Sequence, residues 1–222
     1  RMPKLQIPLY KIYQELFHHF GPQGWWPGDT PFEIMVGAIL TQNTNWKNVQ
    51  KAIVNLKRAK VLTPVKLHAL PVSALAQLIK PAGYFNVKAK RLKNFLDFLF
   101  AEYEGKLSSM AKEDLVVLRG KLLNVNGIGP ETADSMLLYA FDKPTFVVDA
   151  YTKRFMSRHR WIEHDHDYYG VQRIFHSELK RDHQYFNEYH ALIVRLAKDF
   201  CRTKAVCEGC PLNKPKFWKS KA

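Results

Sequence analysis

Several features that define other classes of protein are missing from this sequence. Its 222 residues contain no apolar run close to the roughly 20 residues that cross a bilayer. The N-terminal segment lacks the basic and then apolar pattern of a secretory signal. We therefore expect a cytoplasmic protein that does not act at a membrane.

Cysteine is scarce, and the three cysteines lie close together at Cys201, Cys207 and Cys210. Three cysteines cannot form a closed disulfide framework, because one is always left over. Their clustering indicates metal ligands or the remnant of a metal site.

Runs of alternating apolar and polar residues, which are typical of half-buried strands, are also missing, as are internal repeats and low-complexity linkers. Helix start signals recur instead. Thr30, Pro31 and Glu33 supply an N-cap, a proline at the first helical position and the reciprocal acid of a capping box.

Further helix starts are predicted at the caps Asn45, Ser73 and Asn86 and at Pro130. Apolar residues at helical spacing then predict buried stripes, such as Leu92, Phe95, Leu96 and Leu99. Three more helical patterns lie near residues 150–158, 168–180 and 186–200. The sequence therefore predicts an all-α protein of roughly ten helices.

Basic residues exceed acidic residues, 34 to 20, which gives a net charge of +14. Such an excess favours a polyanionic partner by long-range attraction, and nucleic acid is the natural candidate. Composition alone equally allows lysine and arginine that only keep the surface hydrated.

A tight turn, residues 124–129, lies between two predicted helices, and its Gly127 and Gly129 flank the apolar Ile128. Glycines permit a close approach of the main chain to a ligand, while Ile128 would anchor the turn in the core. The N–H groups at the start of the following helix favour an anion such as phosphate. Taken alone, the motif also fits an ordinary turn between helices.

Together with its surroundings, this turn resembles the helix-hairpin-helix base-excision glycosylases related to endonuclease III, over about residues 25–213. Residues 125–133 match the family hairpin, L-P-G-V-G-x-K-T-A, at both glycines, the apolar residue between them, and Thr132 and Ala133. Asp149 falls where the family keeps its catalytic aspartate, and it could also be a purely structural N-cap. Gln42 falls at the wedge residue that fills the gap left by an extruded base.

The resemblance implies two helical lobes with the active-site cleft between them. One is a central helix barrel over residues 31–143 that contains the hairpin, and the other combines residues 1–30 with 144–222. Gly127, Ile128, Gly129, Thr132 and Gln42 would contact double-stranded DNA that contains a damaged base. The protein is expected to act as a monomer.

Glu131 stands where bifunctional members carry the lysine that forms a Schiff base and nicks the strand. Because a carboxylate cannot act as an amine nucleophile, the resemblance implies a monofunctional glycosylase that leaves an abasic site. Two alternatives stay open. Another amine, such as Lys153 or the N-terminus, could restore lyase activity, or the chain could be a non-catalytic DNA-binding module.

Aromatic residues suggest the base that is removed. Trp25, Trp26 and Pro27 precede the first capped helix, and Trp46 follows Gln42 by four residues. Flat aromatic walls favour a purine made cationic by alkylation, although adjacent tryptophans also serve as core anchors. The placement looks most like the 3-methyladenine branch of the family, with uracil or mismatched thymine as the alternative substrate.

The cysteine cluster resembles the C-terminal [4Fe-4S] loop of the family, which would place a fourth cysteine where this chain has Lys216. A cubane needs four ligands, and lysine is a poor one. Either Cys201, Cys207 and Cys210 hold a cluster with an unusual fourth ligand, or the cluster is lost and the loop is held by packing and polar contacts. Zinc is a third alternative. The glycosylase chemistry needs none of these metals.

Overall fold

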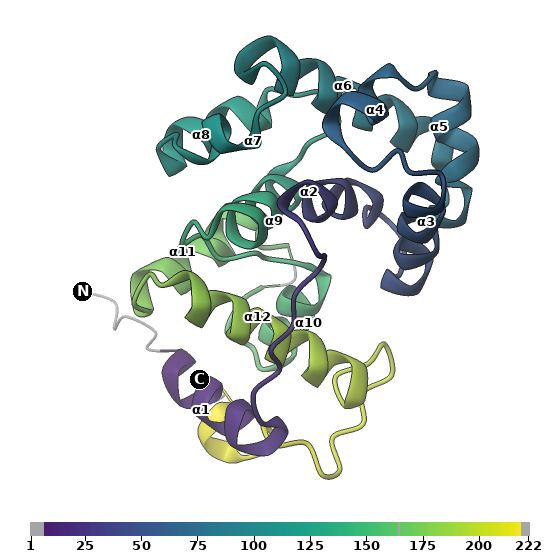
Figure 1. The fold of residues 1–222 in the computed structure, drawn as a ribbon. Helices are drawn as coiled ribbons and strands as arrows, with labels where there is room; N and C mark the ends of the chain where they lie inside the picture. Colours follow the sequence, from purple (N-terminus) through teal and green to yellow (C-terminus); the bar gives the residue numbers. More distant parts are fainter. Residues whose placement is uncertain (1–6, 164, 219–222) are drawn as a thin grey trace. The chain divides into compact units, whose positions relative to one another are not determined.

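A computed structural model describes residues 7–163 and 165–218, and within this part the chain forms helices and connecting turns without strands (Figure 1). The all-α prediction is confirmed. The chain divides into two compact units, one formed by residues 26–143 and the other by residues 1–25 with 144–222. No helix in the described part is long and apolar enough to cross a membrane.

The unit of residues 26–143 holds eight α-helices and one short 3-10 helix within a single run of chain. They are α2 (Pro31–Leu40), α3 (Trp46–Arg58), α4 (Pro64–Ala69), α5 (Val72–Leu78), η1 (Lys80–Ala82), α6 (Phe85–Tyr103), α7 (Leu107–Ala111), α8 (Leu115–Leu123) and α9 (Pro130–Phe141).

The other unit combines the two ends of the chain. Its described elements are α1 (Leu9–Phe20), α10 (Ala150–Arg158), α11 (Tyr168–Glu178), α12 (His183–Asp199) and the 3-10 helix η2 (Pro215–Phe217). Helix α12 packs against both α1 and α10. The Tyr189 hydroxyl on α12 donates to the Leu9 carbonyl at 2.8 Å, which ties the first described helix to the last.

Local signals place several helix starts correctly. The Thr30 hydroxyl accepts from the Glu33 N–H at 3.2 Å, and the Asn45 side chain accepts from the Asn48 N–H at 3.1 Å. Helix α9 begins at Pro130 as predicted. These starts follow from contacts within three residues of each cap, so sequence alone suffices for them.

Two predicted caps are wrong. Ser73 lies inside the first turn of α5, because Pro71 precedes that helix and lets it start at Val72. Asn86 also lies inside a helix. The turn before α6 places Tyr84 in the left-handed region, at φ 45°, and the first helical bond runs from the Lys88 N–H to the Tyr84 carbonyl.

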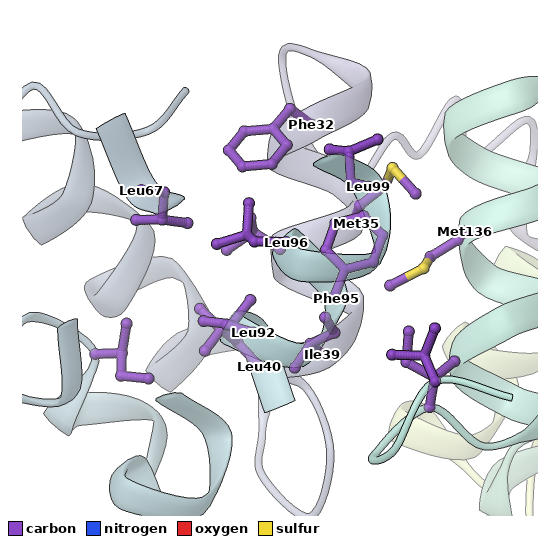
Figure 2. Packing of buried hydrophobic residues seen from close by; sticks show 14 of the residues in the cluster. Phe32, Met35, Ile39, Leu40, Leu67, Leu92, Phe95, Leu96, Leu99 and Met136 are labelled. Carbon is purple, nitrogen blue, oxygen red and sulfur yellow. The ribbon is translucent and has the colours of Figure 1, made fainter. Parts of the chain in front are cut away.

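The core of the residue 26–143 unit is built around α6. The predicted stripe of Leu92, Phe95, Leu96 and Leu99 is fully buried. Figure 2 shows these side chains among apolar residues from α2, α4 and α9: Phe32, Met35, Ile39, Leu40, Leu67 and Met136. Burying large apolar side chains stabilises the fold by about 1.5–3 kcal/mol each, and here it fixes α2 and α9 on one scaffold.

Two sets of contacts fix the hairpin between α8 and α9: the burial of its apolar residues and an ion pair between the two helices. Ile128 and Val125 are buried in the same core, as predicted for Ile128. Arg119 on α8 forms a two-point ion pair with Asp134 on α9, with both nitrogen–oxygen distances at 2.8 Å. The two helices and their turn therefore form one braced element.

Candidate functional site

Asp149 lies at the junction between an extended segment and α10. Residues 145–148 are buried, and the ring of Phe146 stacks on Phe175 with ring centroids 3.8 Å apart. Asp149 then caps α10, with Oδ1 accepting from the Thr152 N–H at 2.7 Å and the Thr152 hydroxyl at 2.9 Å. The cap and the candidate catalytic group are therefore the same side chain.

The second oxygen of this carboxyl, Oδ2, lies 3.2 Å from Nε2 of His190 on α12. The Asp149 side chain is 13% exposed, so the carboxylate is largely buried without being sealed from solvent. Burial by itself raises the pKa of Asp149. The charge of His190, 3.2 Å away, and the bonds from Thr152 outweigh it, and the pKa is lowered below its ordinary value. The carboxyl is accordingly ionised at neutral pH.

The hairpin presents two different glycines. Gly127 has φ 96°, and a Cβ there would lie 2.2 Å from Cγ of Arg91, so the stem of that arginine fills the space beside it. Gly129 has ordinary extended angles, φ −94° and ψ 179°, and no atom lies within 4 Å of the position a Cβ would take. The open face of the hairpin is therefore at Gly129, directly before the N-terminus of α9.

Gln42, the predicted wedge, is held inside its own unit. Its amide nitrogen donates to the Gly127 carbonyl and the Thr132 hydroxyl, both at 2.9 Å, and its amide oxygen accepts from Arg91 at 2.5 Å. Thr132 is buried and serves as a partner of this amide. The structure thus brings Gln42, Gly127 and Thr132 together, as members of one hydrogen-bonded group.

The four predicted base-pocket residues have different surroundings. Trp25 and Trp26 are exposed and fall in different units, and Pro27 is half-buried. The ring of Trp26 meets Tyr139 edge to face with centroids 6.4 Å apart. Trp46 packs beside Gly37 of α2, where an added Cβ would lie 3.6 Å from its ring. Trp26 and Trp46 therefore each contact a helix of the hairpin-containing unit.

The residues that decide the question of lyase activity are Glu131 and the candidate amines, Lys153 and the N-terminus. Glu131 is exposed in the first turn of α9, where its negative charge suits the positive end of the helix. Lys153 is half-buried on α10, one turn after Asp149. The N-terminal residue lies outside the described residues. The carboxylate of Glu131 cannot form a Schiff base.

The three cysteines lie in a loop after α12 that polar contacts hold in place. Arg158 donates to Cys201 Sγ at 3.3 Å and to the carbonyls of Arg202 and Thr203, and Arg154 donates to the Cys201 carbonyl at 2.7 Å. Leu212 and Phe217 anchor the end of the loop in the core.

These residues do not fit a four-ligand iron-sulfur cluster. Lys216, at the position of the fourth ligand, pairs with Glu15, as does Lys214. In the described part of the chain, no three His, Cys, Asp or Glu side chains form a group that could hold a metal ion.

Sequence reasoning missed three residues at these sites. Lys88 is fully buried, donates to the carbonyls of Leu40 and Ala82 at 2.8 Å, and has a pKa that burial lowers to about 8. Two of these residues carry a signal in the sequence. Lys88 lies on the apolar stripe of α6, four residues before Leu92, and His190 lies on the apolar face of α12. Arg91 carried no signal, because it stands in a lysine-rich stretch with Lys88, Lys90 and Lys93.

Comparison with known proteins agrees with this arrangement. A Methanocaldococcus jannaschii protein named "Putative DNA repair glycosylase MJ1434" is 50% identical over 207 residues, covering 92% of this chain and 94% of its own. The structure of a Helicobacter pylori 3-methyladenine DNA glycosylase bound to 1,N6-ethenoadenine matches with a TM-score of 0.75 and 28% identity, covering 86% of this chain and 97% of that one. An endonuclease III–DNA complex shares the fold, with a TM-score of 0.79 and 21% identity over 92% of this chain and 91% of that one.

The family model described as "HhH-GPD superfamily base excision DNA repair protein" matches residues 36–181, which include the hairpin and Asp149. The match covers more than half of the sequence and agrees with the resemblance carried by the hairpin motif. The chain therefore belongs to the HhH-GPD superfamily of base excision DNA repair proteins, and it is a DNA glycosylase.

Proposed function

We propose that this chain is a monofunctional glycosylase that rotates an alkylated base out of double-stranded DNA and hydrolyses its N-glycosidic bond, leaving an abasic site. The observation that carries the proposal is the Asp149 carboxylate, which is ionised, partly exposed and fixed by Thr152 and His190. One oriented negative charge is what this reaction requires of the protein.

Departure of the base leaves positive charge on the sugar, with oxocarbenium character in the transition state. A fixed carboxylate beside the anomeric carbon stabilises that charge or orients the attacking water. Because Asp149 is already held in place in the free protein, little reorganisation is needed when charge develops. The nucleotide must first leave the base stack, at a cost of roughly a few kcal/mol that contacts to the DNA backbone offset.

The absence of a lyase step follows from Glu131. A Schiff base requires an amine, and the side chain at this position is a carboxylate in the first turn of α9. The proposed product is therefore an abasic site in an unbroken strand.

The preference for an alkylated base rests on two supports. The Helicobacter pylori neighbour, which is named as a 3-methyladenine glycosylase, is matched along nearly its whole length. Trp25, Trp26 and Trp46 supply aromatic surface, and flat rings attract a cationic purine. Alkylation places positive charge on the base, so it departs readily and one carboxylate suffices.

The decisive experiment compares Asp149→Asn with Asp182→Asn. Both aspartates cap helices of the same unit, since Asp182 accepts from the Tyr185 N–H at 2.9 Å, and asparagine preserves a cap almost fully. We expect Asp149→Asn to lower the single-turnover rate of base release by at least roughly a hundredfold, as loss of a charge-stabilising group does. Asp182→Asn should keep the wild-type rate, and equal rates in the two variants would exclude Asp149.

A panel of duplexes tests the substrate and the reaction type. Duplexes carrying 3-methyladenine, 1,N6-ethenoadenine, uracil or mismatched thymine are incubated with the protein, and free base is measured. We expect release of alkylated purines, strand breaks only after alkali, and no adduct after borohydride. A trapped adduct would restore the bifunctional alternative. Tight binding without release of any base would favour a DNA-binding module.

A further inference from the structure

The two oxygens of the Asp149 carboxyl have different partners. Oδ1 accepts both bonds from Thr152, at 2.7 and 2.9 Å, and these bonds belong to the cap of α10. Oδ2 takes no part in the cap and faces Nε2 of His190 at 3.2 Å. The cap therefore fixes only Oδ1, and the orientation of Oδ2 depends on its neighbour on α12, His190.

His190 is well held for this task. Its side chain is 9% exposed, and α12, which carries it, packs against α10. The ring of His190 meets Phe146 edge to face, with centroids 6.4 Å apart, on the segment that leads into Asp149. The histidine thus contacts both the carboxyl and the chain that positions it. All three residues belong to the same unit.

We propose that His190 is a positioning residue for base release, which fixes the orientation of Oδ2 of Asp149. This inference rests on the proposed function, because the consequence of an oriented carboxylate is a faster departure of the base. His190 acts through Asp149 and need not touch the DNA.

The balance of forces on Asp149 supports this role. Burial raises the pKa of the carboxyl, and the largest opposing effect is the positive charge that His190 carries when protonated, followed by the hydrogen bonds of Thr152. Removing His190 would leave burial opposed only by the neutral Thr152. The pKa of Asp149 would then rise. The carboxylate would become protonated and lose its charge at a higher pH than in the wild-type protein.

The other titratable groups around this segment are not among the causes that shift the pKa of Asp149. On α11, His176 accepts from the Phe146 N–H at 2.9 Å and Tyr168 accepts from the Val148 N–H at 3.4 Å, so both face the main chain before Asp149. On α1, Glu15 pairs with Lys214 and Lys216. On α10, Lys153 stands one turn after Asp149 and Arg158 binds the cysteine loop. Within the described residues, the charge acting on the carboxyl is that of His190.

The test uses His190→Gln and His190→Leu in the full chain. Glutamine places an N–H near the position of Nε2 without a charge, whereas leucine removes both the polar contact and the charge. His68→Gln is the matched control, because His68 forms a 2.8 Å pair with Asp97 on the surface of the other unit. Thermal unfolding verifies that each variant is folded.

Two quantities are followed against pH: the single-turnover rate on a 3-methyladenine duplex, and the ¹³C carboxyl resonance of Asp149 in the DNA-free protein. We expect the acid limb of the rate and the carboxyl midpoint to move to higher pH in both His190 variants. At neutral pH, His190→Leu should lose roughly tenfold in rate and His190→Gln less, since misplacement of a reacting group costs up to about a hundredfold. His68→Gln should change neither quantity.

An unmoved acid limb and carboxyl midpoint in folded His190→Gln would overturn the inference. If leucine prevents folding, the glutamine variant decides alone. Full base release by Asp149→Asn contradicts the proposed function itself, whereas an inactive Asp149→Asn together with an unmoved acid limb in His190→Gln contradicts the role of His190 only. The carboxyl titration needs no substrate, so it separates the two failures.

Discussion

The two glycines of the hairpin meet different requirements, although one residue separates them. Gly127 adopts a left-handed φ of 96° and leaves room for the stem of Arg91, which in turn holds the amide of Gln42. Gly129 needs neither an unusual backbone angle nor space within the protein. A glycine with neither of these needs leaves room for a ligand to approach the main chain closely.

This difference predicts that two alanine substitutions affect different properties, the stability of the fold and the affinity for DNA. Gly127→Ala should lower the free energy of unfolding by about 2 kcal/mol or more, because the left-handed angle is strained for alanine and the Arg91 stem must move. Gly129→Ala should change it by less than about 0.5 kcal/mol, yet weaken binding to a duplex with an abasic analogue roughly tenfold. Chemical denaturation and fluorescence anisotropy measure the two effects. Unchanged DNA affinity in Gly129→Ala would remove this face of the hairpin from the interface.

At the residue scale, the sequence predicts contacts between residues that are close in the chain and misses contacts between residues that are far apart in it. Asp149 was predicted both as a cap and as the catalytic carboxylate, and its cap with Thr152 spans three residues. Its partner His190 lies 41 positions later, and only the packing of α12 on α10 joins them. Gln42 is similar, because its amide contacts Arg91 and the hairpin residues Gly127 and Thr132, which lie 49, 85 and 90 positions later in the sequence.

At the scale of elements, the hairpin owes its geometry to the pair between α8 and α9. The Asp134 side chain is fully buried and that of Arg119 is 18% exposed, so their two-point ion pair is largely shielded from water. Loss of one member would leave a buried charge without its main counterion, which costs more than loss of an exposed pair.

Arg119→Met should therefore lower the free energy of unfolding by about 2–3 kcal/mol, with the methionine retaining most of the apolar stem. The control is Arg195→Met on α12, because the Arg195–Asp199 pair spans one turn of the same helix and is exposed. That variant should lose less than about 0.5 kcal/mol. Urea unfolding measures the free energy of unfolding of both variants. Equal losses would show that the α8–α9 ion pair stabilises the protein no more than the exposed pair on α12.

Helix starts could be predicted wherever a cap and its partner are close in sequence. Thr30, Asn45 and Pro130 are examples, whereas Tyr84 begins α6 from a left-handed angle that no residue-type preference predicts. The five- and six-residue helices α7 and α4 carry too little apolar periodicity to be recognised. Their place is set by the shared core of the unit.

On the scale of the whole molecule, the excess of positive charge is the feature that composition alone revealed. The net charge of +14 is distributed over both compact units, each of which contains more basic than acidic residues. Some of these cations are used internally, such as Lys57 with Glu33 and Lys121 with Glu113. A charge distributed in this way suits a partner that offers phosphates along its length, and double-stranded DNA is such a partner.

Binding to undamaged duplex DNA should accordingly weaken steeply with salt. Each neutralised phosphate releases condensed counterions, so the logarithm of the association constant falls with the logarithm of salt concentration by about 0.9 for each contact. An interface with about six contacts would lose roughly three orders of magnitude in affinity between 50 and 200 mM salt. The measurement is an anisotropy titration, repeated with a duplex of the same sequence whose linkages are uncharged methylphosphonates. A slope near zero on the natural duplex would mean that the positive charge serves only to hydrate the surface, whereas a steep slope that disappears on the methylphosphonate duplex assigns it to phosphate contact.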